Sequence, residues 1–298
     1  MAIFQVWSPA KVNLVLYLRG RREDGFHLIE SLVAPVSLFD RITIELGTAS
    51  SSAMRCEVES TGFPVPRGEE NLVSRAVAAY EKAVRRPLPT VRVRLEKFIP
   101  VGAGLGGGSS NAAALLVLLQ RIFKNPLNDL ELTKVGASVG ADVPFFLSGR
   151  PAILRGVGEQ IEPVALPQTL HLVLCSDGSS LLTKDVYAEA RRSLTVFSRV
   201  SNIGAFLEGK LDLVNALQND LEAAAIAMHP GIEQMKRDVV TAGAAAGLMT
   251  GSGSCVFGVC RSRAHARRVA EILSARGYWA VPVQTLTQTW IFCYWCAG

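Results

Sequence analysis

Apolar and polar residues alternate over residues 90–99 (TVRVRLEKFI), and this period of two predicts a strand with one buried face. In residues 71–84 the apolar side chains instead recur every three to four positions, which predicts an amphipathic helix. Further strands are expected where β-branched and aromatic residues lie between turn residues. They fall at residues 4–7, 12–18, 41–46, 54–58, 151–156, 171–176, 255–260 and 279–283, and in the final run 289–296.

Helical patterns are interspersed among these strands. They fall at residues 109–123, 129–139, 184–193, 201–207 and 229–240. The character of the chain changes near residues 156–167. We therefore expect an α+β protein with two lobes, residues 1–160 and 161–298, and a cleft between them.

Composition indicates a large folded core and a small charged ligand. Of the 298 residues, 49% are apolar and 19% are charged, which is typical of a globular protein. The net charge of +5 suits a ligand that carries phosphate, but no Lys/Arg block is dense enough to predict nucleic-acid binding. No apolar run approaches the roughly 20 residues of a membrane span, and residues 1–13 show no targeting pattern. We expect a soluble, cytoplasmic protein without a membrane partner, and no heptad pattern predicts its oligomeric state.

The six cysteines are scattered, and most lie in apolar, strand-like settings, as reduced cysteines usually do. Cys293 and Cys296 have CxxC spacing, but no second pair and no histidine lies near them in the sequence. The pattern therefore does not indicate metal binding or redox chemistry. The run that carries both residues is expected to be a buried closing strand, with an interface as the alternative.

The most distinctive stretch is PVGAGLGGGSSNAAALL, residues 100–116, in which five glycines and two serines precede an alanine-rich helical pattern. Glycines let successive N–H groups point into one concavity, and the following helix offers unpaired N–H donors and the positive end of its dipole. These features predict a phosphate-binding loop. The alternative is a mobile linker with Ser109 as the helix N-cap, but a linker would not explain the apolar Leu105 among the glycines.

Two other phosphate motifs are excluded by their context. The stretch matches GxGxxG from Gly102 to Gly107, but a dinucleotide-binding unit needs a second strand ending in an acidic residue about 20 positions later. That region reads FKNPLNDLELTKVG, and no GxxxxGK[ST] pattern is present. A second glycine-rich loop, residues 247–254, precedes the strand CVFGVC. It either lines the same cleft from the other lobe or forms an ordinary turn.

Three motifs resemble those of the GHMP kinase superfamily and occur in the expected order. They are SPAKVNLVLYL (residues 8–18), PVGAGLGGGSSNAAA (100–114) and MTGSGSCVFGV (249–259). The resemblance covers essentially the whole chain. It implies a two-lobed GHMP kinase fold, with a left-handed βαβ unit in the N-terminal lobe and a ferredoxin-like C-terminal lobe.

Further details resemble one branch of the superfamily. DGFH (residues 24–27), GADVPFF (140–146) and LQNDLE (217–222) are similar to the members that act on a cytidine diphosphate-linked methylerythritol. The resemblance implies that the γ-phosphoryl group of ATP is transferred to the 2-hydroxyl of this small molecule. The ATP phosphates would be bound by Pro100, Val101, Gly102, Ala103, Gly104, Leu105, Gly106, Gly107, Gly108, Ser109 and Ser110.

The resemblance also implies that Lys11 and Asp142 are the catalytic residues. The Asp142 carboxylate would orient the acceptor hydroxyl or take its proton, and Lys11 would keep that carboxylate ionised. Asn13 lies two positions after Lys11, on the same strand face, and would hold the substrate near the pair. Taken alone, Asp142 is also explained as a helix N-cap, and Lys11 as a solvated strand residue.

The cytidine end of the acceptor would be recognised by Phe26, His27 and Tyr187. In the family an aromatic ring stacks on the cytosine and the histidine reads its edge. This chain has Phe26 where the family commonly has tyrosine, which removes only a hydroxyl from the stacking ring. Tyr187 matches a second aromatic residue, but the preceding loop CSDGSSLLTKDVY lacks the family's proline and serine-threonine pair, for which Thr183 is the substitute. Taken alone, His27 is a surface or core histidine.

The adenine site and the metal are less specific. Asn71 matches a position near adenine, although a helix N-cap alone would explain it. ATP implies Mg²⁺, and without an acidic cluster the ion would be carried mainly by phosphates and waters, assisted by Ser109 or Ser110. The alternative functions are another small-molecule kinase of homoserine or mevalonate type, and a non-catalytic ligand-binding relative.

Overall fold

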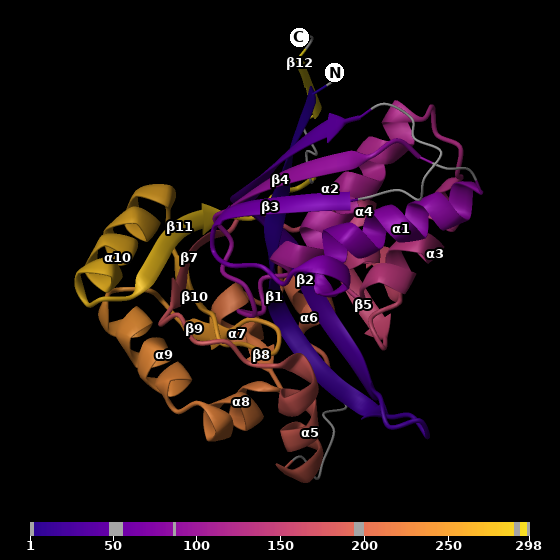
Figure 1. The fold of residues 1–298 in the computed structure, drawn as a ribbon. Helices are drawn as coiled ribbons and strands as arrows, with labels where there is room; N and C mark the ends of the chain where they lie inside the picture. The colour runs from indigo at the N-terminus through magenta and orange to yellow at the C-terminus, as the bar shows by residue number, and fades with distance from the viewer. Residues whose placement is uncertain (1–2, 48–55, 86–87, 194–199, 289–292, 297–298) are drawn as a thin grey trace.

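Two β-sheets and the helices packed on them make up the fold (Figure 1). The computed structural model describes residues 3–47, 56–85, 88–193, 200–288 and 293–296. The first sheet is built on a long antiparallel hairpin of β1 (Ile3–Arg21) and β2 (His27–Leu46). A shift in register between Pro9 and Ala10 lets the chain accommodate a proline inside β1 without ending the strand.

A βαβ unit extends this sheet. β3 (Cys56–Gly62) and β4 (Val91–Lys97) pair in parallel, and α1 (Leu72–Val84) connects them. Every second residue of β4 is buried, as the period of two predicts. β4 also pairs with β2 and therefore lies inside the sheet. The glycine loop follows the end of β4.

Helices that follow the glycine loop pack with α1 against the first sheet (Figure 1). They are α2 (Gly107–Ile122), α3 (Asp129–Val139) and α4 (Val143–Ser148). Their apolar side chains form one core with those of β2 and β4, including Ile42, Ile44 and Leu95. β5 (Ala152–Gly156) and β6 (Gln160–Pro163) then complete this side of the molecule, with β5 paired to β2.

The second sheet is antiparallel throughout, with the strand order β11-β7-β10-β9. Its strands are β7 (His171–Ser176), β9 (Gly247–Met249), β10 (Val256–Cys260) and β11 (Trp279–Gln284). In the chain, α9 (Gly231–Thr241) precedes β9, and α10 (Arg263–Ala275) lies between β10 and β11. This β-α-β-β-α-β order confirms the expected ferredoxin-like lobe.

The second half of the chain also adds strands to the first sheet. Between β7 and α9 the chain forms α5 (Thr183–Ser193), α6 (Ile203–Leu207), α7 (Leu213–Ala216), β8 (Gln218–Asn219) and α8 (Glu222–Met228). β8 pairs in parallel with β1, and β12 (Cys293–Cys296) pairs antiparallel with the start of β1. The second half of the chain therefore contributes strands to both sheets. The division of the lobes at residue 160 stays a prediction.

Most helices lie where the apolar spacing predicts them, and α3 matches its expected bounds. The expected strands at residues 4–7 and 12–18 are one continuous β1, and β2 begins at His27 rather than at residue 41. The sequence patterns do not predict α4, α7, α8 and α10, although α10 buries Ala266, Val269 and Leu273 at helical spacing. Residues 54–55 and 289–292 of the expected strands lie outside the described residues. None of the described helices is long and apolar enough to cross a bilayer.

Candidate active site

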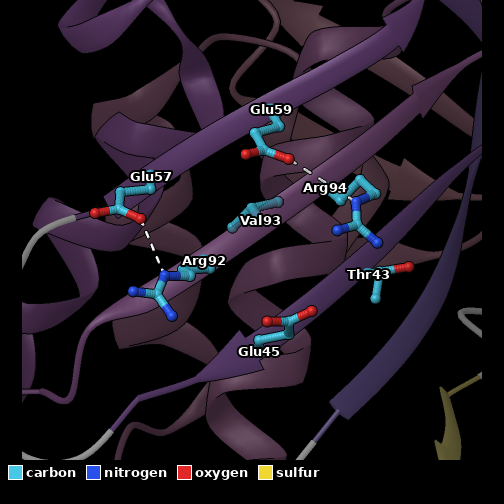
Figure 2. Close-up of a pocket in the computed structure, with 7 residues that line it drawn as sticks. All are labelled: Thr43, Glu45, Glu57, Glu59, Arg92, Val93 and Arg94. Atoms are coloured by element: carbon cyan, nitrogen blue, oxygen red, sulfur yellow. Dashed lines mark hydrogen bonds and ion pairs between the residues drawn. The ribbon is translucent and has the colours of Figure 1, made fainter.

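Two hollows of the described structure differ in size and chemistry. The smaller, about 70 Å³, lies on the exposed face of β2, β4 and β3, and Figure 2 shows its charged side chains. Arg92 pairs with Glu57 at 3.0 Å and Arg94 with Glu59 at 4.0 Å, so cross-strand ion pairs already use its charges. The larger is a cleft of about 890 Å³ lined by the glycine loop, β1, the start of α2, Asp142 and α5. The cleft is therefore the candidate site.

The cleft gathers nearly all of the residues proposed from the sequence. It is lined by Lys11, Asn13, Phe26, His27, Asn71, residues 100–109, Asp142 and Tyr187. Ser110 is the exception, because its side chain is buried and its hydroxyl has no hydrogen-bond partner among the described residues. Gly251 and Ser252 also line the cleft, so the second glycine-rich loop contributes to the same space from the other half of the chain.

The glycine loop is held between the two sheets. Gly104 and Gly106 have φ angles of +75° and +69°, a region that glycine enters without strain. A Cβ on Gly104 would lie 2.3 Å from the Thr250 carbonyl oxygen. The Ala103 carbonyl oxygen accepts a hydrogen bond from the Cys255 N–H at 3.3 Å. The loop thus packs closely against the second glycine-rich loop, and a mobile linker does not describe it.

The N-terminus of α2 faces the cleft. Gly106 is the N-cap of this helix, so Ser109 lies within the first turn and not at the cap. Gly106, Gly107, Gly108 and Ser109 all line the cleft. The first N–H groups of a helix have no partners within it and carry the positive end of the helix dipole. This arrangement is suited to bind a phosphate group.

Lys11 and Asn13 lie side by side on β1, as their two-residue spacing predicts. Lys11 Nζ donates a hydrogen bond to Asn13 Oδ1 at 2.5 Å, and Asn13 Nδ2 donates one to Ser31 Oγ at 2.9 Å. Burial lowers the pKa of Lys11, and the negative charge of Asp142 opposes this shift in part. Among the described residues the buried ammonium has a neutral amide as its only hydrogen-bond partner, so an anionic ligand in the cleft would stabilise it.

Asp142 precedes α4 at the N-cap position, yet its side chain makes no capping hydrogen bond. Its carboxylate has no hydrogen-bond or ion-pair partner among the described residues, so helix capping does not explain the residue. Burial, and after it the charge of Asp142, raises the pKa of Tyr187. Asp142 therefore lies within electrostatic reach of both Lys11 and Tyr187, with its oxygens available to a ligand.

Three aromatic side chains line the cleft at the β1–β2 turn, the start of β2 and α5. The rings of His27 and Tyr187 are 5.5 Å apart between centroids and tilted by 39°. Phe26 also lines the cleft and is 64% exposed. Burial, followed by the charges of Arg191 and Arg21, lowers the pKa of His27, which keeps its imidazole neutral at neutral pH. A neutral imidazole both donates and accepts hydrogen bonds, so this group suits a planar heteroaromatic base.

Asn71 lines the cleft but is engaged in helix capping. Its Oδ1 accepts a hydrogen bond from the Val73 N–H at 2.9 Å, and its Nδ2 donates one to the Pro66 carbonyl oxygen at 2.9 Å. The N-cap explanation accounts for these two contacts. A contact between Asn71 and adenine stays a prediction.

A buried network of polar side chains lies beneath the glycine loop, and the sequence motifs do not predict it. Asp40 forms an ion pair with Lys97 and accepts hydrogen bonds from Asn111 Nδ2 at 2.9 Å and from the N–H groups of Phe98 and Ile99 at 2.8 and 2.9 Å. Burial lowers the pKa of Lys97, and Asp40 opposes that shift by its charge and its hydrogen bond. The available signal was that Lys97 occupies a buried position of the alternating β4 pattern.

The described side chains offer no metal centre, since no group of three His, Cys, Asp or Glu residues among them is placed to hold an ion. The four cysteines that the structure describes with their side chains are free. Burial raises the pKa of Cys56 and Cys260 to about 11, which keeps both thiols protonated and unreactive at neutral pH.

Comparison with known proteins defines the class to which this fold and cleft belong. The model of the N-terminal domain of GHMP kinases matches residues 71–150, and that of their C-terminal domain matches residues 202–278. The fold is therefore that of a GHMP kinase, as the sequence motifs predict.

Closer relatives identify the branch. The 4-diphosphocytidyl-2-C-methyl-D-erythritol kinase of Thermus thermophilus is 41% identical over 91% of this chain and 92% of its own. The protein of the same name from Syntrophus aciditrophicus is 37% identical over 94% of this chain and 98% of its own. A crystal structure of 4-(cytidine 5'-diphospho)-2C-methyl-D-erythritol kinase has a TM-score of 0.80 at 38% identity, over 94% of this chain and 98% of that one. The chain belongs to the 4-diphosphocytidyl-2-C-methyl-D-erythritol kinase family.

Proposed function

We propose that this chain transfers the γ-phosphoryl group of ATP to the 2-hydroxyl of 4-diphosphocytidyl-2-C-methyl-D-erythritol, in the non-mevalonate pathway to isoprenoid precursors. The observation that carries the proposal is the set of residues that line the cleft. A helix N-terminus suited to phosphate, a lysine near a carboxylate that no described residue contacts, and aromatic rings line one continuous space. These parts match the phosphates of ATP, the reacting hydroxyl and the cytosine of the acceptor. Relatives with this name align over more than nine-tenths of the chain.

ATP would bind with its phosphates at the glycine loop and the start of α2. The backbone N–H groups there supply donors, and the glycines allow the phosphates to approach the backbone closely. Mg²⁺ would arrive with the ATP phosphates, which together with waters provide the oxygen ligands it prefers. Ser109 offers a hydroxyl on the cleft surface, and the unpartnered Ser110 hydroxyl lies in the same helical turn.

Phosphoryl transfer requires positioning and charge stabilisation more than covalent chemistry. Asp142 would accept the hydrogen bond of the acceptor hydroxyl and take its proton as the new O–P bond forms and the bond to ADP breaks. Lys11 would stabilise the negative charge on the transferred group. Asn13 fixes Lys11 through its Oδ1, and one N–H of its amide stays available to the acceptor.

Cytosine would lie among Phe26, Tyr187 and His27. The first two rings offer apolar faces for stacking, and the neutral imidazole reads the polar edge of the base. No observed contact favours the alternative kinases of homoserine or mevalonate type. A non-catalytic relative is expected to lack Lys11 or Asp142, and both are present and share one part of the cleft.

The test is ADP release from Mg-ATP with 4-diphosphocytidyl-2-C-methyl-D-erythritol, homoserine and mevalonate offered separately. Turnover with the cytidylated acceptor alone is the expected result. Turnover with homoserine or mevalonate instead would contradict the proposed acceptor. Nucleotide binding without turnover of any acceptor would contradict the kinase activity and favour a ligand-binding protein.

A further inference from the structure

Helix α5 presents more than Tyr187 to the cleft. Lys184, Tyr187 and Arg191 all line the cleft, and their spacing of three and four residues places them on one face of the helix. Tyr187 is therefore flanked by two cations, one turn away on either side. The roles described above use the ring and leave the two charges without a function.

Arg191 connects two elements that line the cleft. Its Nη2 donates a hydrogen bond to the Gly25 carbonyl oxygen at 3.2 Å, which links α5 to the turn between β1 and β2. Its guanidinium forms no ion pair with any described residue, so most of its five N–H donors are available to a ligand. The next residue differs, since Arg192 points to Glu189 and pairs with it at 3.1 Å.

A second guanidinium converges on the same place. The Nη2 atoms of Arg21 and Arg191 lie 3.7 and 3.8 Å from the position that a Cβ on Gly25 would occupy. Both charges also act on His27 and lower its pKa, after the larger effect of burial. The turn carries two acidic side chains: Asp24 is paired with Arg22 at 2.7 Å, and Glu23 forms no ion pair with any described residue. Neither Arg21 nor Arg191 forms an ion pair with a described residue, so the two positive charges repel each other, and an anionic ligand between them would relieve the repulsion.

We infer that Arg191, assisted by Arg21, binds the diphosphate of the acceptor and makes the cleft specific for a cytidine diphosphate ester over an uncharged cytidine derivative. The inference rests on the proposed function, because it assigns His27 and its neighbours to the base. A diphosphate follows its base by only a ribose, so cations beside the base-reading histidine are within its reach. The planar fork of arginine matches two phosphate oxygens at once, which a lysine at this position would not do.

The test compares CDP with cytidine as ligands in titration calorimetry, without ATP. The unmodified protein should bind CDP more tightly than cytidine. Arg191→Gln should weaken CDP binding about tenfold and leave cytidine binding unchanged, because a hydrogen-bonded charge contact is lost only with the phosphates. Arg191→Lys should restore part of the CDP affinity. Arg192→Gln is the matched control, since it removes the neighbouring charge outside the cleft and should change neither affinity.

Equal weakening of CDP and cytidine by Arg191→Gln would show that the arginine only shapes the Gly25 turn, and it would overturn the inference. Unchanged CDP binding would also overturn it. Failure of the inference is distinguishable from failure of the proposed function. CDP discrimination that depends on Arg191, in a protein that phosphorylates none of the three acceptors, would contradict the proposed function alone. Turnover of the cytidylated acceptor with unaltered CDP binding in Arg191→Gln would contradict the inference alone.

Discussion

Two buried lysines line the same cleft, and their surroundings differ in one decisive respect. Lys97 is bonded to the carboxylate of Asp40, whose other hydrogen bonds come from Asn111 and two backbone N–H groups. Lys11 is bonded to the neutral amide of Asn13, and Asp142 affects it by charge alone. Burial lowers the pKa of both lysines, but only Lys97 has a counter-ion in hydrogen-bonding contact.

The comparison separates a closed charge pair from an open one. A buried ion pair with satisfied hydrogen bonds fixes geometry, and the Lys97 network joins the end of β4 to the start of α2 beneath the glycine loop. An open pair retains binding capacity, since neither Lys11 nor Asp142 is in direct contact with an opposite charge from any described residue. Burial and charge alone do not distinguish the two pairs, whereas their hydrogen-bond partners do.

The largest effect is expected where the open pair loses its carboxylate. Asp142→Asn should reduce kcat by about a thousandfold, because the acceptor hydroxyl loses its base while the side-chain volume is kept. ATP affinity and the unfolding temperature should change little, since the carboxylate makes no hydrogen bond to the described residues. Steady-state kinetics and thermal unfolding of the same preparation measure both. A variant that retains full kcat would exclude Asp142 from the chemistry.

The closed pair should respond in the opposite way. Asp40→Asn leaves Lys97 buried without a counter-ion and should cost about 3 kcal/mol in the free energy of unfolding, measured in urea. Without its counter-ion Lys97 binds its proton less tightly in the folded state than in the unfolded state, so the lost stability should return in part as pH rises. A variant as stable as the original at neutral pH would show that the network is not a closed structural pair.

The sequence predicts the contact of Lys11 with Asn13 better than it predicts the closed pair. Lys11 and Asn13 are two residues apart on one strand, so their shared face follows from strand geometry alone. The glycine loop is likewise contiguous in the chain. Asp40, Lys97 and Asn111 come from two strands and a helix, and they meet only because β4 pairs with β2 in the observed register. No local sequence pattern predicts that register. A lysine at a buried position of β4 does, however, indicate that it has a buried partner.

The helix and loop predictions follow the same rule. α3 begins where expected because a local capping box defines its start. The side chains of the N-cap Asn128 and of Glu131 in the first turn each bond the other's backbone. The position of Arg191 near Gly25 depends on α5 and the β1–β2 turn folding against each other across the cleft, and residue spacing within α5 gives only its helical face. Contacts within one element are predictable, and contacts between distant elements require the structure.

Substitution of His27, at the proposed cytosine site, should change binding of the acceptor and not the rate of phosphoryl transfer. His27→Ala should raise the KM for the cytidylated acceptor about tenfold, because a hydrogen-bonding ring is removed from the base site. The KM for ATP and kcat should stay close to their original values, since the phosphate loop and Asp142 are untouched. Equal increases in both KM values would identify His27 as a structural residue.

The smallest effect, a pH dependence, tests the two lysines together. Because burial lowers the pKa of Lys11, kcat should fall to about half its plateau at a pH below the ordinary lysine value of about 10.5. Global stability should rise over the same interval, since a lysine with a lowered folded-state pKa binds fewer protons folded than unfolded. Activity and stability therefore move in opposite directions, which separates loss of the Lys11 charge from alkaline unfolding. Lys11→Arg keeps its charge at high pH, so its residual activity should lose the alkaline decline. An identical decline in that variant would assign the titration to another group and leave Lys11 without the electrostatic role that its open environment predicts.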